Sequence, residues 1–78
     1  MTTPGEHQLF RYGRGPATRI YSLRVNRGRT ELWRVTIEPG RPDAAVMEDD
    51  FADVDACATF LEEVRRTLVA GGWKEVDD

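Results

Sequence analysis

The sequence predicts one α+β domain, in which a three- to four-stranded antiparallel sheet is packed on one face by a single C-terminal α-helix. Residues 18–26 and 31–38 alternate apolar and polar side chains with the period of a half-buried strand. Residues 53–70 instead repeat apolar side chains at helical spacing. Since the sheet face and the helix stripe can bury their apolar atoms only on each other, we expect one two-layer core in (β)βββα order.

The chain is expected to begin with a flexible lead-in over residues 1–6, which are mostly small and polar. Residues 8–12 are a candidate edge strand. Two Gly and one Pro within residues 13–16 then interrupt the chain before the main hairpin.

The register of this hairpin is predicted from the parity of its apolar residues. If the odd-numbered apolar residues share one face, the opposed pairs are Val25 with Glu31, Leu23 with Trp33, and Tyr21 with Val35. This pairing requires a loop with an odd number of residues, and a three-residue loop over residues 27–29 satisfies it. We therefore expect Trp33 to point into the core.

A second turn over residues 39–42 leads to a weaker strand over residues 44–48, so the strands span residues 8–48. Ala45 and Met47 are expected on its inner face. This last strand is followed by the helix.

The helix over residues 53–70 is the best defined element. Asp53 suits its N-cap, and two glycines at residues 71–72 suit its end. Its apolar stripe consists of Cys57, Phe60, Leu61, Val64 and Leu68. Trp73 is expected to fold back onto the sheet edge or the last helical turn, and residues 74–78 form a charged tail.

The net charge of −3 hides an asymmetry between the two halves of the chain. Residues 1–41 carry eight Arg against three acids (+5), and residues 42–78 carry three basic residues against eleven acids (−8). Such asymmetry is typical either of a surface for nucleic acid or an acidic partner, or of a fold whose halves pair with each other. Ten Arg against one Lys also indicates a GC-rich bacterial genome.

Few residues are available for catalysis, because the chain has one Ser, one Cys and one His: Ser22, Cys57 and His7. No two of them are predicted to meet, and a nucleophile needs a base within hydrogen-bond reach. The acidic residues around Asp49 do not have the spacing of a calcium loop, and no phosphate-binding loop is present. We therefore expect no enzyme activity, metal, cofactor or small-molecule substrate.

A single cysteine excludes an intramolecular disulfide, and no apolar run is long enough to cross a bilayer. These features predict a cytoplasmic protein that does not bind membranes.

The candidate binding site is the outer face of the sheet, together with its turn. Its predicted residues are Ile20, Ser22, Arg24, Arg27, Arg29, Leu32 and Arg34. Arginines interleaved with apolar residues suit a protein interface, and a thin-cored domain with an unprotected edge strand favours a partner protein or a second copy. The alternatives are nucleic-acid binding by the Arg-rich hairpin and a plain solvated sheet face.

The order of strands, with Phe51 before a helix that ends near a Gly-Trp pair, resembles the WGR domains of poly-ADP-ribose polymerases and bacterial regulators. The resemblance covers residues 20–73 and is one of pattern. The Trp-Gly-Arg motif that defines those domains is absent after the second strand, and Tyr-Gly-Arg at residues 12–14 precedes the main hairpin. No residue role is therefore carried over.

Overall fold

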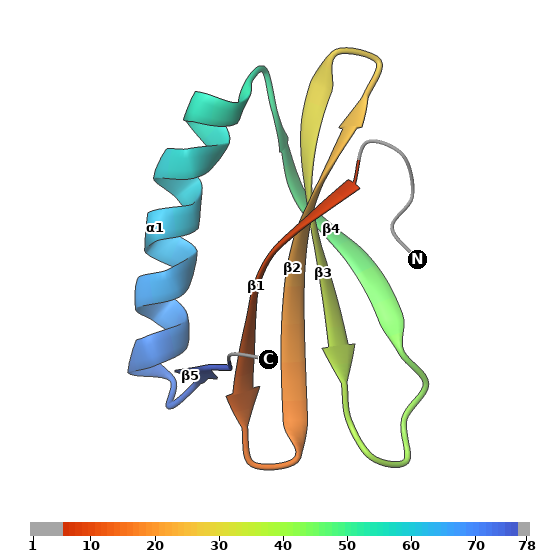
Figure 1. The fold of residues 1–78 in the computed structure, drawn as a ribbon, viewed down its shortest axis with the longest axis vertical. Helices are drawn as coiled ribbons and strands as arrows, with labels where there is room; N and C mark the ends of the chain where they lie inside the picture. Colours follow the sequence, from red (N-terminus) through yellow and green to blue (C-terminus); the bar gives the residue numbers. More distant parts are fainter. Residues whose placement is uncertain (1–5, 77–78) are drawn as a thin grey trace.

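The computed structural model of the protein describes residues 6–76, which form a five-stranded antiparallel sheet and one helix (Figure 1). The elements are β1 (Glu6–Arg14), β2 (Ala17–Asn26), β3 (Arg29–Ile37), β4 (Ala44–Phe51), α1 (Val54–Ala70) and β5 (Lys74–Glu75). The strand order across the sheet is β4-β3-β2-β1-β5. The predicted α+β class is confirmed, with five strands in place of three to four.

Two of the expected boundaries differ from the structure. The first four strands run from Glu6 to Phe51, beyond the predicted range of 8–48, because the hairpin ladders continue to these ends. The expected charged tail contains β5, which pairs with Tyr12 and Gly13 of β1. Residues 1–5 of the expected lead-in lie outside the described residues.

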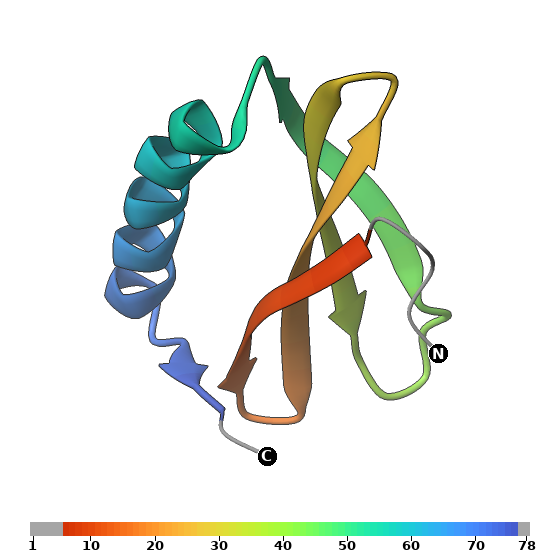
Figure 2. The same cartoon turned by 45° about the horizontal axis from the view of Figure 1, so that its top comes forward.

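The helix packs on one face of the sheet only (Figures 1 and 2). It begins after β4 and ends before β5, so it connects the two edges of the sheet. The buried apolar core between these layers consists of Phe10, Tyr12, Tyr21, Leu32, Cys57, Leu68 and Trp73.

The predicted register of the central hairpin is wrong by one residue. Leu23 lies opposite Leu32, and Trp33 lies opposite Ser22. Because neighbouring strand residues point to opposite faces, this shift places Leu32 in the core, with no exposed surface, and places Trp33 on the other face.

The cause of this shift is the turn between β2 and β3. The loop has two residues, Arg27 and Gly28, with φ angles of 52° and 77°. Positive φ at both positions is the signature of a type I′ turn, whose twist matches that of an antiparallel hairpin. A two-residue turn reverses the parity that a three-residue loop would give.

The predictions for the helix are confirmed. Asp53 is its N-cap, and its carboxylate accepts a hydrogen bond of 2.9 Å from the amide of Ala56. Cys57 and Leu68 are buried, and the rest of the predicted stripe is partly buried against the core: Phe60, Leu61 and Val64.

The end of α1 joins the helix to the edge of the sheet. The Trp73 amide donates to the Leu68 carbonyl (2.9 Å), and the Gly72 amide donates to Val69 (3.1 Å), which is a Schellman motif. Gly72 has the positive φ, 88°, that this motif requires. Trp73 is thereby turned into the core, where the guanidinium groups of Arg14 and Arg19 lie 4.7 and 4.6 Å from its ring centroid.

Candidate functional site

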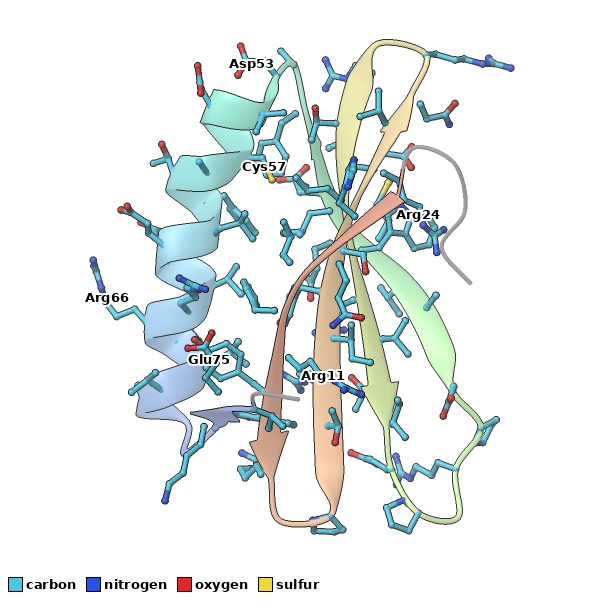
Figure 3. The ribbon with its side chains drawn as sticks, in the orientation of Figure 1. Arg11, Arg24, Asp53, Cys57, Arg66 and Glu75 are labelled. Atoms are coloured by element: carbon cyan, nitrogen blue, oxygen red, sulfur yellow. The ribbon has the colours of Figure 1, made fainter. Side chains whose placement is uncertain are left out.

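The face of the sheet opposite α1 is not covered by any helix or strand of residues 6–76 (Figure 2), and we call it the open face. Three rows of cross-strand neighbours lie on it: Arg11–Ile20–Val35–Ala45, Gln8–Ser22–Trp33–Met47, and Arg24–Glu31–Asp50. Figure 3 shows Arg24 on the side of the sheet away from α1, whereas Cys57 lies between helix and sheet.

The centre of the open face is apolar. Ile20, Trp33 and Val35 are only partly buried, although none of them packs into the core cluster. Met47, beside Trp33 on β4, remains 45% exposed. We call these four residues the Trp33 patch. They span three adjacent strands, so their side chains form one continuous surface.

Trp33 is held in place by its two neighbours in the sheet. Its indole Nε1–H donates a hydrogen bond of 2.9 Å to Glu31 Oε1. The Arg24 guanidinium lies 4.3 Å from its ring centroid, in the geometry of a cation–π contact. A ring that is ordered in this way loses little conformational entropy when a partner covers it.

The prediction that Ala45 and Met47 lie on the inner face of β4 is also wrong. The pairing of Trp33 with Met47 and of Val35 with Ala45 places both residues on the open face. The ladder shifts by one residue between Leu32 and Trp33, which indicates a β-bulge at Glu48. Beside the bulge, Glu48 forms an ion pair of 2.8 Å with Arg34.

Among the predicted site residues, Ile20, Ser22 and Arg24 lie on the open face. The placement of Leu32 and Arg34 on this face is wrong, because the type I′ turn moves both to the helix side. Leu32 is in the core, whereas Arg34 is partly exposed on the helix side and pairs with Glu48.

Arg27 and Arg29 lie at the β2–β3 turn as expected, and both are exposed. Arg29 forms an ion pair of 3.1 Å with Asp50 of β4. The hairpin arginines are therefore not a uniform basic stripe, because Arg29 and Arg34 face carboxylates of the next strand.

Sequence reasoning missed Trp33, Val35 and Met47 as surface residues. The available signal was the Arg-Gly pair at residues 27–28, which can form a two-residue turn and so sends Trp33 and Val35 outward. The side of Met47 depends in addition on the pairing of β4 with β3.

The charge asymmetry between the halves of the chain is partly resolved by pairing between them. Arg29 and Arg34 of the basic half pair with Asp50 and Glu48 of the acidic half. These contacts join β3 to β4. They agree with the interpretation that the two halves of the fold pair with each other.

The residues considered for catalysis do not come together. Ser22 lies on the open face, whereas His7, opposite Leu23, belongs to the helix-side face. Cys57 is fully buried, and this burial raises the pKa of its thiol, which favours the unreactive protonated form. Residues 6–76 contain no group of three or more His, Cys, Asp or Glu side chains that could hold a metal ion. Within the same range, α1 does not have the length and apolar character needed to cross a membrane.

Comparison of the chain with protein-family models, curated proteins and solved structures finds no match.

Proposed function

We propose that this protein is a non-enzymatic binding module of the bacterial cytoplasm, which docks a second copy of itself on its open face. The observation that carries the proposal is the Trp33 patch, an ordered apolar surface across β2, β3 and β4 on the sheet face opposite the helix. Large exposed apolar patches rimmed by polar residues are typical of protein interfaces. A free, fully buried Cys57 is compatible with a reducing compartment.

The chemistry of the patch favours a protein as its partner. Trp and Arg are the residues most enriched among those that dominate binding energy, and here they form one stacked unit. Four strands about 4.8 Å apart and about eight residues long cover roughly 500 Å² in projection. Because side chains enlarge the accessible area beyond this projection, the face approaches the roughly 800 Å² per partner of a stable complex.

The charges around the patch favour a second copy. We consider two copies whose open faces meet, related by a two-fold axis that lies between the two faces. The axis is parallel to the strands and lies midway between β2 and β3, so β2 of one copy faces β3 of the other. Arg24 then meets Glu31 of the second copy, and Ile20 meets its Val35, in accordance with the row positions on the open face. Opposite charges thus meet around an apolar centre, and the contact is self-complementary, as a two-fold interface requires.

Nucleic-acid binding is the second candidate function, because Trp33 with Arg24 offers a stacking platform on the sheet. Against it, Arg29 and Arg34 already pair with carboxylates, and the net charge is −3. A phosphate backbone needs a locally basic footprint.

Sedimentation equilibrium tests the proposal. The natural protein is expected to show twice the 8.9 kDa mass of its chain at high concentration. Trp33→Ser should shift the equilibrium toward monomer by at least about tenfold, because it removes the central aromatic side chain. Val69→Ser is the matched control, since Val69 is 63% exposed on the helix and lies outside the open face.

A charge exchange tests the arrangement of the two copies. Arg24→Glu and Glu31→Arg should each weaken the dimer, and the double variant should restore it, because the cross-copy pair is reversed and kept. A monomeric natural protein at all concentrations contradicts the proposal. If that monomer binds a labelled single-stranded oligonucleotide with a steep salt dependence, the second candidate function replaces it.

A further inference from the structure

The edge of β1 that faces away from β2 is only half covered. β5 pairs with Tyr12 and Gly13, and the Val76 amide donates to the Arg11 carbonyl at 2.9 Å. Within residues 6–76, no strand pairs with this edge beyond Arg11, along residues 6–10. Unpaired backbone groups along a strand edge form a template for another strand.

A hollow of about 260 Å³ lies directly beside this uncovered edge, between β1 and α1. It is lined by Leu9, Phe10, Ala58, Leu61, Glu62 and Arg65. The register of β1 shifts between Gln8 and Phe10, so Leu9 is the extra residue of a β-bulge. Leu9 and Leu61 are only partly buried, which leaves the floor of the hollow apolar and open.

We propose that the hollow and the uncovered part of β1 together form a site for an extended peptide segment of a partner protein. The segment adds to β1 as an antiparallel strand, and one apolar side chain fills the hollow. β5 already pairs with the same edge in the same antiparallel direction, so the geometry of this edge accepts a strand. In this type of recognition the backbone supplies affinity, and the pocket selects the side chain.

The charges at the rim define the peptide further. Arg65 is engaged within the protein, because it lies 3.7 Å from the carboxylate of Glu75 and 4.8 Å from the Phe10 ring centroid. Glu62 has no ion pair within the described part of the chain. In a strand, residues two positions apart point to the same face. A peptide with a basic residue two positions from its apolar residue can therefore place its positive charge near the carboxylate of Glu62.

This site is independent of the proposed dimer. The hollow is on the helix side of the sheet, whereas the Trp33 patch is on the open face, so one surface can be occupied while the other is not. A dimer formed through the open faces would present two such peptide sites.

The probe for the site is a fluorescein-labelled heptapeptide, Thr-Lys-Thr-Leu-Thr-Val-Thr, whose Lys, Leu and Val share one face as a strand. We expect saturable binding by fluorescence anisotropy with a Kd below about 1 mM. Chemical-shift changes in the ¹⁵N-labelled protein should centre on Gln8, Leu9 and Phe10. Replacement of the central Leu by Ser in the peptide should weaken binding at least about tenfold.

Two matched protein variants complete the test. Ala58→Phe fills the hollow from an exposed helix position and should weaken binding at least about tenfold without unfolding the protein. Ala56→Phe makes the same change on an exposed position outside the hollow and should leave binding unchanged. The proposal is overturned if the probe does not bind, if both variants act alike, or if the shifts map to the Trp33 patch. Trp33→Ser should dissociate the dimer and leave probe binding intact, so the two proposals fail separately.

Discussion

Both faces of the sheet carry apolar side chains, but only one is covered. On the helix side, Tyr21 and Leu32 are sealed beneath α1 with Cys57. On the open face, Ile20, Trp33 and Val35 are equally apolar in type and remain partly exposed. Since β3 carries apolar side chains on both faces, the position of the helix and the register of the β2–β3 turn determine which of them become core and which become surface.

This difference gives the two faces different roles. The helix-side face stabilises the fold, because its side chains are removed from water during folding. The open face has apolar area that a partner can still remove from water. Adjacent residues of β3 should therefore respond very differently to substitution.

The largest expected effect is at Leu32. Leu32→Ala should lower the free energy of unfolding by about 3 kcal/mol, because it leaves a cavity at a fully buried position. Urea denaturation at low protein concentration, where the monomer prevails, measures this loss. Trp33→Ala is the adjacent comparison and should cost the monomer less than about half as much. Equal losses at the two positions contradict the assignment of the faces.

Substitution of Cys57 tests the packing of the helix on the covered face of the sheet. Cys57→Ser should cost about 1–3 kcal/mol, since a hydroxyl is then buried in an apolar site. Ala56→Ser, at an exposed position of the same helix, is the control and should cost under about 0.5 kcal/mol. Thermal unfolding followed by circular dichroism compares the two.

The turn that sets the register is tested at Gly28. Gly28→Ala should destabilise the protein by about 1 kcal/mol, because a Cβ is disfavoured at a φ of 77° although space for it is available. Arg27→Asn should act in the opposite direction by a few tenths of a kcal/mol, since Asn tolerates the positive φ of this position better. Chemical denaturation of both variants checks these signs.

The smallest expected effect is the pH dependence contributed by Cys57. Burial raises the pKa of its thiol above the ordinary value of 9.0, so the folded state holds the proton more tightly than the unfolded state. The stability due to this group is complete below pH 9.0 and is lost as the pH rises through the folded pKa. The stability of the natural protein relative to Cys57→Ala should therefore decline above pH 9.0. A constant difference contradicts thiol burial.

The fold class and the helix could be predicted from the sequence because each depends on periodicity and local capping. The stripe from Cys57 to Leu68 has one period, and Asp53 and Gly72 satisfy backbone groups at its ends. β5 could not be predicted, since two residues carry no pattern and Lys74 and Glu75 pair only because the helix end brings them to β1.

The face of the candidate site could not be predicted from periodicity alone. β3 has apolar residues on both parities, Leu32 on one and Trp33, Val35 and Ile37 on the other. Periodicity favours Trp33, Val35 and Ile37 as the core set, but the two-residue turn at Arg27 and Gly28 buries Leu32 instead. Arg at the first turn position is a weaker signal than Asn or Asp would have been.

Trp33 itself reports most directly on whether the open face is a docking surface. In protein labelled with 5-fluorotryptophan, ¹⁹F NMR gives separate signals for Trp33 and Trp73, which Trp33→Phe assigns. We expect the Trp33 signal to shift and to lose its sensitivity to a soluble paramagnetic quencher as the protein is concentrated, while buried Trp73 remains unchanged. A Trp33 signal that is equally accessible at every concentration, or one that is shielded even in dilute solution, contradicts the account.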